Sequence, residues 1–168
     1  MRASDASAYL QRAVDTDPPE PGQGVADAVG ALADAGPPLA AAVYDSAVAC
    51  ESLAMASADG AAQEQARTLL AAAGQVNPLA GFGLGVQPGG GATAALAFET
   101  DDQARENADT RARLASGPAP GQGGDFADRF SLGTTAAEGR VVTMELEPTE
   151  DARVLSDLSS GPVLFATC

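Results

Sequence analysis

The spacing of hydrophobic residues changes near residue 77, and this change divides the chain into two parts. In the first part, apolar residues recur every three to four positions, which is typical of one face of a helix, and runs of proline and glycine separate the segments. The predicted helices cover residues 4–14, 25–35, 45–58 and 61–73. The sequence therefore predicts a mainly helical segment over residues 1–76.

In the second part, apolar residues alternate with small ones, which is typical of strands with one buried face. Residues 82–86 and 94–98 alternate in this way on either side of a glycine-rich turn. The Thr-x-x-Gln pattern that begins at Thr100 is typical of a helix start. These signals predict a strand-strand-helix unit over residues 79–116.

A second strand-strand-helix unit is predicted over residues 127–160, because the chain matches itself at an offset of 48 residues. When residues 82–105 are set over residues 130–153, seven of 24 positions are identical without a gap. Both copies begin with Phe-x-Leu-Gly and end with Ala-Arg. We interpret the match as an internal duplication, with residues 118–124 as the loop between the copies.

The two units predict an α+β fold in a single domain, residues 1–168, with one four- or five-stranded antiparallel sheet. The helices of the two units are expected on the apolar face of this sheet. The apolar tail, residues 163–167, is either a final edge strand or a buried coil. The expected core residues are Phe82, Leu84, Leu96, Phe98, Phe130, Leu132, Val142, Met144 and Leu146.

The opposite face of the first hairpin carries only glycine, alanine and threonine, whose side chains are too small to shield a sheet. We therefore expect another element to pack closely there. The candidates are the amino-terminal helical segment and a partner or ligand, because uncovered apolar sheet surface often marks an interaction site.

The composition excludes several kinds of chemistry. Without histidine the chain has no Ser-His-Asp or Cys-His nucleophile and no histidine metal site. Without lysine it has no Walker phosphate loop and no Schiff base. Two cysteines are too few for a four-thiolate metal site in one chain. No cofactor or metal site is predicted, and carboxylates are the reactive groups that remain.

A net charge of −14 argues against nucleic acid and anionic membrane surfaces as partners. No stretch approaches the roughly 20 apolar residues that a transmembrane helix needs, and the first residues lack the apolar core of a signal peptide. The chain is therefore expected to be either an extracytoplasmic, mature segment whose export signal is not present, or a cytoplasmic protein.

Cys50 and Cys168 are predicted to form a disulfide, the alternative being one buried and one exposed thiol. A bridge would tie down the carboxyl end of the chain. It would also favour the extracytoplasmic location, since disulfides persist in oxidising compartments.

Two groups of residues resemble ligand sites, but we prefer a structural interpretation of each. The glycine run at 81–85 lacks the last glycine of a dinucleotide loop, because Pro88 stands in its place. Asp15, Asp17 and Glu20 have the oxygen atoms that calcium prefers, but prolines interrupt the spacing of a calcium-binding loop. A covered strand and a solvated acidic loop explain them better.

Glu99 and Glu147 occupy equivalent positions in the two copies, and so do Arg105 and Arg153. If the glutamates met, they could perform acid–base or glycosidic chemistry, and paired arginines could bind an anion. We expect instead that each glutamate ends a strand in solvent, and that each arginine pairs with a Glu or Asp in the neighbouring turns of its own helix, for example Arg105 with Asp101 or Asp109.

Three stretches of the second part, DFADRFSL (125–132), VVTMEL (141–146) and GPVLFATC (161–168), resemble uncharacterised exported or lipoprotein-type domain proteins of high-GC actinobacteria. The resemblance covers roughly residues 75–168. It implies an α+β fold and an extracytoplasmic address, and it carries no functional residues.

The scarcity of reactive side chains favours a non-enzymatic extracytoplasmic binding or accessory domain, monomeric or homodimeric, whose partner is a protein or envelope component. One alternative is a small apolar-ligand carrier with a cavity between the helices and the sheet. A second alternative is a hydrolase that uses carboxylates alone.

Overall fold

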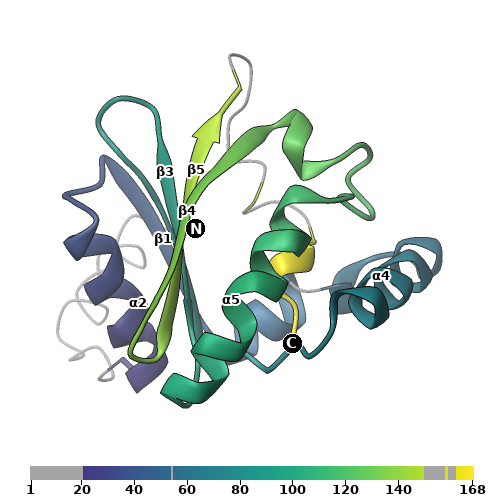
Figure 1. Cartoon of the computed structure of the whole chain (residues 1–168), viewed down its shortest axis with the longest axis horizontal. Coiled ribbons are helices and arrows are strands. Elements are labelled where there is room, and N and C mark those ends of the chain that lie inside the picture. The colour runs from purple at the N-terminus through teal and green to yellow at the C-terminus, as the bar shows by residue number, and fades with distance from the viewer. Residues whose placement is uncertain (1–20, 54, 150–157, 159–161) are drawn as a thin grey trace, which may run out of the picture.

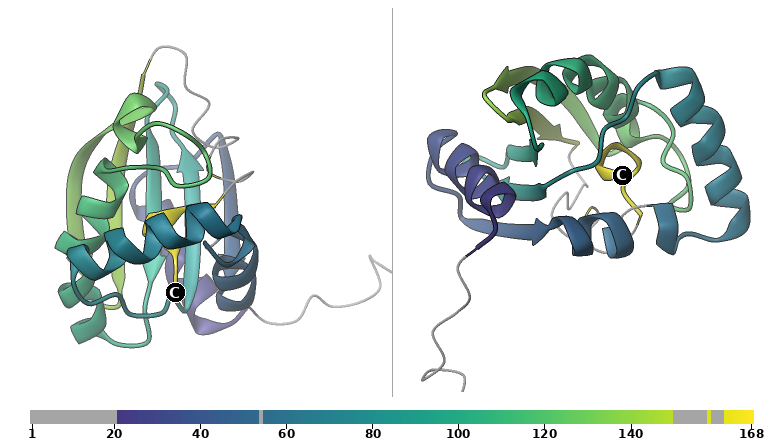
Figure 2. Two further views of the ribbon diagram at one scale, coloured as in Figure 1. Left: turned by 90° about the vertical axis from the view of Figure 1, so that its right-hand side faces the viewer. Right: turned by 90° about the horizontal axis from the view of Figure 1, so that it is seen from below.

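The structure, a computed structural model, describes residues 21–53, 55–149, 158 and 162–168. It contains a five-stranded antiparallel sheet with helices on both faces, which confirms the α+β prediction (Figure 1). The predicted helix 4–14 lies outside the described residues, and so does the expected helix of the second unit, residues 150–159, except for residue 158. The helices at the two faces are α2 (Gln23–Asp34) on one side, and α5 (Asp101–Ser116) with α4 (Gly60–Ala73) on the other (Figures 1 and 2).

The strands lie in the order β1-β2-β3-β5-β4, so the two predicted hairpins meet through their second strands. Their bounds are β1 (Ala40–Asp45), β2 (Gly81–Val86), β3 (Ala92–Ala97), β4 (Phe130–Glu138) and β5 (Val141–Pro148). The predicted helix start is also present. The Thr100 hydroxyl accepts a hydrogen bond from the Gln103 amide at 3.2 Å, and the Gln103 side chain accepts one from the Glu99 amide at 3.1 Å.

The two hairpins pair with each other as expected for two copies related by a twofold axis. The strand register within each hairpin, however, differs between the copies. Ala95 lies directly opposite Thr143, its equivalent at the offset of 48 residues. If the second hairpin had the register of the first, Phe130 would lie opposite Met144, but it lies opposite Pro148. The gap-free alignment therefore does not describe the first strands of the two hairpins.

The fifth strand is β1, which the hydrophobic pattern did not predict. Its three leading alanines favour a helix by intrinsic propensity, but pairing with β2 supplies their backbone hydrogen bonds. Tyr44 also stacks on Phe82, with ring centroids 6.3 Å apart. The helix predicted over 45–58 is broken after β1 into the short turns α3 (Ser46–Val48), η1 (Ala49–Leu53) and η2 (Met55–Ser57).

The tail is a buried 3₁₀ turn, η4 (Leu164–Ala166), and not an edge strand. Phe165 is fully buried, and its ring packs edge-on against Phe82, Phe126 and Phe130 at centroid distances of 6.4, 5.2 and 6.4 Å. The tail therefore supplies the centre of the aromatic core. Eight of the nine predicted core residues are buried there, and Leu132 is partly buried against them.

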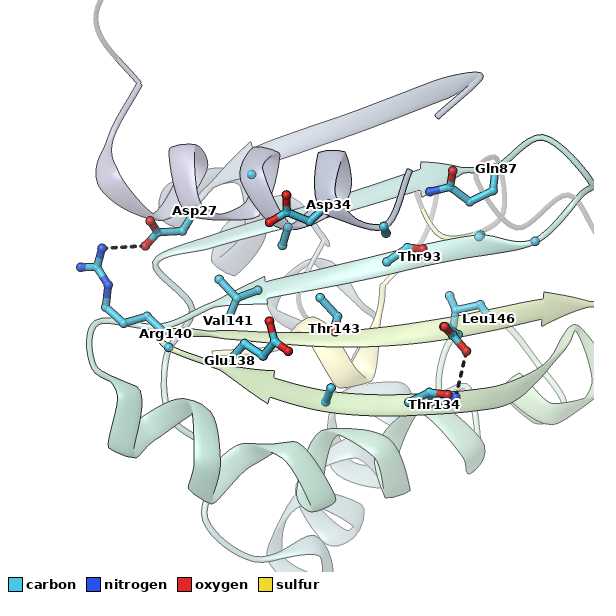
Figure 3. Close-up of a pocket in the computed structure, with 18 of the residues that line it drawn as sticks. Asp27, Asp34, Gln87, Thr93, Thr134, Glu138, Arg140, Val141, Thr143 and Leu146 are labelled. Atoms are coloured by element: carbon cyan, nitrogen blue, oxygen red, sulfur yellow. Dashed lines mark hydrogen bonds and ion pairs between the residues drawn. The ribbon is translucent and has the colours of Figure 1, made fainter. Parts of the chain in front are cut away.

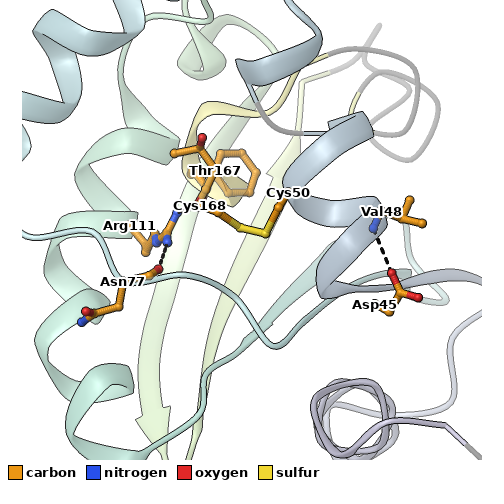
Figure 4. Close-up of a disulfide and its surroundings, with 8 residues drawn as sticks. Asp45, Val48, Cys50, Asn77, Arg111, Thr167 and Cys168 are labelled. Atoms are coloured by element: carbon orange, nitrogen blue, oxygen red, sulfur yellow. Dashed lines mark hydrogen bonds between the residues drawn. A yellow bond between two sulfur atoms is a disulfide. The ribbon is translucent and has the colours of Figure 1, made fainter.

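Arg111, a fully buried cation on α5, holds the tail in place (Figure 4). Its Nη1 donates to the carbonyl oxygens of Phe165 and Thr167 at 3.0 and 2.6 Å, and its Nη2 donates to that of Asn77 at 2.5 Å. Its guanidinium also lies 5.8 Å from the ring centroid of Phe98. Burial lowers the pKa of Arg111 to about 10, so the side chain is still charged at neutral pH.

Cys50 and Cys168 form the predicted disulfide, with Cα atoms 5.3 Å apart (Figure 4). The bridge joins the η1 turn to the end of the tail. Beside it, the Val163 amide donates to the Leu53 carbonyl at 2.6 Å. Both connections fasten the tail to the η1 turn, which lies more than 100 residues earlier in the chain.

On the other face, α2 packs on the small side chains of the first hairpin, as expected of the amino-terminal helical segment. The backbones of Gly24 and Gly81 touch, so a Cβ on Gly24 would overlap the carbonyl of Ala80. Farther along the helix, Ala28 and Leu32 fill the space above the next glycines of β2. The glycine run is thus a covered strand, and no helix opens after it.

We predict that Gly24→Ala lowers the free energy of unfolding by about 1–3 kcal/mol, because the added methyl group forces the helix away from the sheet. Gly30→Ala on the same helix is the matched control. No atom lies within 4 Å of a Cβ there, so it should raise stability by about 0.5–1 kcal/mol. Urea unfolding measures both variants, and equal effects would contradict the close packing.

Replacing Arg111 by leucine is expected to lower the free energy of unfolding by at least about 3 kcal/mol, because two buried carbonyl groups and one partly buried carbonyl group lose their donor. The exposed Arg105 is the control position, where leucine should change stability by less than about 0.5 kcal/mol. Chemical unfolding of both variants decides whether Arg111 anchors the tail.

Removing the disulfide with Cys50→Ser and Cys168→Ser together should cost roughly 4–5 kcal/mol, because the bridge closes a loop with a sequence separation of 118 residues. Non-reduced wild-type protein and the double variant would be compared by urea unfolding. Equal midpoints would show that the bridge does not restrain the unfolded chain.

Candidate functional site

Helix α2 covers only part of its face of the sheet, and the rest forms an open groove of about 870 Å³ (Figure 3). One wall is α2. The floor consists of outward-facing residues of β3, β5 and β4, among them Thr93, Thr143, Val141 and Ala136. These side chains share a face because alternate residues of a strand point the same way. In β4 a bulge between Leu132 and Thr135 shifts the alternation by one residue, so that Ala136 and not Ala137 faces the groove.

Carboxylates dominate the charged lining of the groove. Asp27 and Asp34 are seven residues apart on α2, so both project from the same side of the helix. Other carboxylates come from β4, β5 and the start of α5. The complete set is Asp27, Asp34, Asp101, Glu138, Glu145 and Glu147, and the cation in the lining is Arg140.

Arg140 closes one end of the groove with an ion pair across it (Figure 3). Its Nη2 lies 2.8 Å from the Asp27 carboxylate, which also accepts a hydrogen bond from the Gln23 side chain at 2.8 Å. The Arg140 carbonyl accepts from the Phe98 amide at 2.8 Å, which fixes the turn between β4 and β5. The pair thus joins this turn to α2, and the Arg140 guanidinium is already bound to a carboxylate of the protein itself.

Farther along the groove, Asp34 on α2 and Glu138 at the end of β4 have no ion-pair or hydrogen-bond partner among the residues that the structure describes. Glu145 is partly satisfied, because it accepts from the Thr134 amide at 3.3 Å. Near the other end, Gln87 has its amide nitrogen buried without an acceptor in the same described set. The groove therefore holds unpaired acceptors and one unpaired donor.

The structure does not bring Glu99 and Glu147 together. Ala97 lies opposite Val141 and Ala92 lies opposite Leu146, so the two glutamates lie beyond opposite ends of this strand pair. At about 3.4 Å per residue, roughly 27 Å of strand length separates them. Both are exposed, as expected of solvated strand ends, and they form no catalytic pair.

Arg105 is exposed and pairs with Asp102, three residues before it, and not with Asp101 or Asp109, four residues away. Spacings of three and four both place side chains on one helix face, so the sequence could not choose between them. Arg153 lies outside the described residues, as do Asp15, Asp17 and Glu20, which were expected to form a solvated acidic loop. The arginine pair is therefore untested.

The described part of the chain contains no group of three or more cysteine, aspartate or glutamate residues that could hold a metal ion. In the same residues, no helix is both long enough and apolar enough to cross a membrane. A second, apolar pocket of about 190 Å³ lies between α4 and α5, lined by Leu69, Leu114 and Leu164 among others.

Sequence reasoning did not find the groove, because its walls come from segments more than 100 residues apart. Arg111 could have been found. It falls on the same helix stripe as Ala104, Leu114 and Ala115, where a charged residue needs buried partners. Comparisons with protein-family models, curated proteins and solved structures found no match for this chain.

Proposed function

We propose that this protein is a non-enzymatic binding domain that holds a segment of a protein or envelope component in the groove beside α2. The uncovered half of the sheet face carries the proposal. It is an open groove of about 870 Å³, within the size range of known ligand sites, and its walls belong to regular elements. A site built on such elements needs little rearrangement to bind.

An extracytoplasmic location is part of the proposal. The Cys50–Cys168 disulfide supports it, because such bridges form and persist in oxidising compartments. The resemblance of residues 75–168 to exported or lipoprotein-type domain proteins agrees with it.

The two alternatives have less support. An apolar-ligand carrier needs an apolar cavity between the helices and the sheet, but the groove there is open and has six carboxylates among its lining residues. The apolar pocket between α4 and α5, about 190 Å³, is smaller than the roughly 300 Å³ at which ligand sites begin. A carboxylate hydrolase that uses Glu99 and Glu147 needs the two groups close together, and the strand register separates them.

The proposal is tested by blocking the groove. Thr143→Trp places a large ring at the centre of the floor, where the side chain points outward from the sheet. We expect wild-type protein, immobilised without reduction, to retain an envelope component that Thr143→Trp does not retain. Loss of at least about tenfold in the amount captured corresponds to blocking the site.

Thr68→Trp is the matched control, because it adds the same ring on the exposed side of α4. It should capture the same component as the wild-type protein. If Thr143→Trp retains that component equally well while both variants keep the wild-type thermal midpoint, the groove is not the binding site and the proposal is wrong.

A further inference from the structure

We propose that the occupant of the groove is an arginine-bearing, extended polypeptide segment, and that Asp34 and Glu138 bind its guanidinium groups. This inference rests on the proposed function, because it names the chemistry of the partner for the same groove. It follows from charge complementarity, from an ion pair already present in the groove, and from the unpaired donor of Gln87.

The charge of the groove favours a cationic partner. Six carboxylates line it, and the cation in the lining, Arg140, is already paired with Asp27. The chain as a whole carries a net charge of −14, so the long-range field also attracts cations. A concave surface with one sign of charge concentrates the field and raises the rate of association with an oppositely charged partner.

The Arg140–Asp27 pair shows how the groove accommodates a guanidinium, since it joins the sheet to α2 at 2.8 Å. Asp34 is the next carboxylate on the same side of α2, about 10.5 Å farther along the helix axis. Figure 3 shows Asp34 on α2, the wall of the groove, and Glu138 on β4, the strand of the floor that lies farthest from α2. A guanidinium from outside could donate to either carboxylate with its planar fork of donors.

The remaining lining favours a polypeptide over a simple polyamine. The buried amide nitrogen of Gln87 lacks an acceptor among the described residues, and a peptide carbonyl supplies one once the side chain turns, whereas a polyamine has none. The floor at Thr143, Val141 and Ala136 carries no large side chain. The twelve residues of α2 span about 18 Å, the length of about five extended residues.

The test measures fluorescence anisotropy of labelled decapeptides with the full-length, non-reduced protein. The probe is (Arg-Ser)₅, whose arginines share one face when it is extended, and (Glu-Ser)₅ is the charge-reversed control. We expect saturable binding of (Arg-Ser)₅ at 0.1 M salt and none of (Glu-Ser)₅. Binding should weaken strongly at 1 M salt, because the screening length falls from about 10 to about 3 Å.

The double variant Asp34→Asn/Glu138→Gln should weaken (Arg-Ser)₅ binding by about tenfold or more. The matched control, Glu64→Gln/Asp109→Asn, removes the same two charges from exposed sites on α4 and α5, across the sheet, and should change affinity by less than about twofold. Arg140→Gln should tighten binding, because it releases the Asp27 carboxylate.

Equal weakening by the two double variants, or equal binding of (Glu-Ser)₅, would overturn the assignment of Asp34 and Glu138. Absence of (Arg-Ser)₅ binding would overturn the cationic partner. In that case, capture that is still lost in Thr143→Trp would leave the groove as the binding site, so failure of this inference and failure of the proposed function are distinguishable.

Discussion

The close approach of α2 to β2 is the constraint that shapes the face of the sheet on which α2 lies. Because Gly24 and Gly81 bring their backbones into contact, the helix lies directly over the first hairpin, and Leu32 fills the space above the glycines. The neighbouring strand β5 carries larger outward side chains, including Val141 and Thr143, and offers no such space. The helix therefore stays on one half of the face and leaves the other half as a groove.

On the opposite face of the sheet, the core is filled by the carboxyl-terminal tail, which belongs to no strand and no α-helix. The tail places Phe165 among three other phenylalanines, and its carbonyl groups are satisfied by Arg111. A buried cation is costly unless its donors form hydrogen bonds. Arg111 donates to carbonyl groups of the segments that precede and follow α5. The disulfide then secures the last residue to the η1 turn.

The packing on the two faces of the sheet explains why the groove is rigid. Its floor belongs to strands whose inner faces are packed against the aromatic core, and its wall is a helix held by backbone contact. A partner would meet carboxylates on both sides without first ordering a loop, which reduces the entropy cost of binding. The Arg140–Asp27 pair adds a tie across the groove at one end.

The sequence by itself determined the elements with local signals: the two hairpins, the helix that begins after Thr100, the helices that end near Gly36 and Gly74, and the disulfide between the only two cysteines. Tertiary structure decided the rest. Alanines 40–42 became a strand because β2 offered unpaired backbone groups, and the tail was buried because Arg111 supplied donors from α5. The carboxylates of the groove meet only because the strand order places β5 and β4 beside α2, and such long-range order leaves no periodic trace in the sequence.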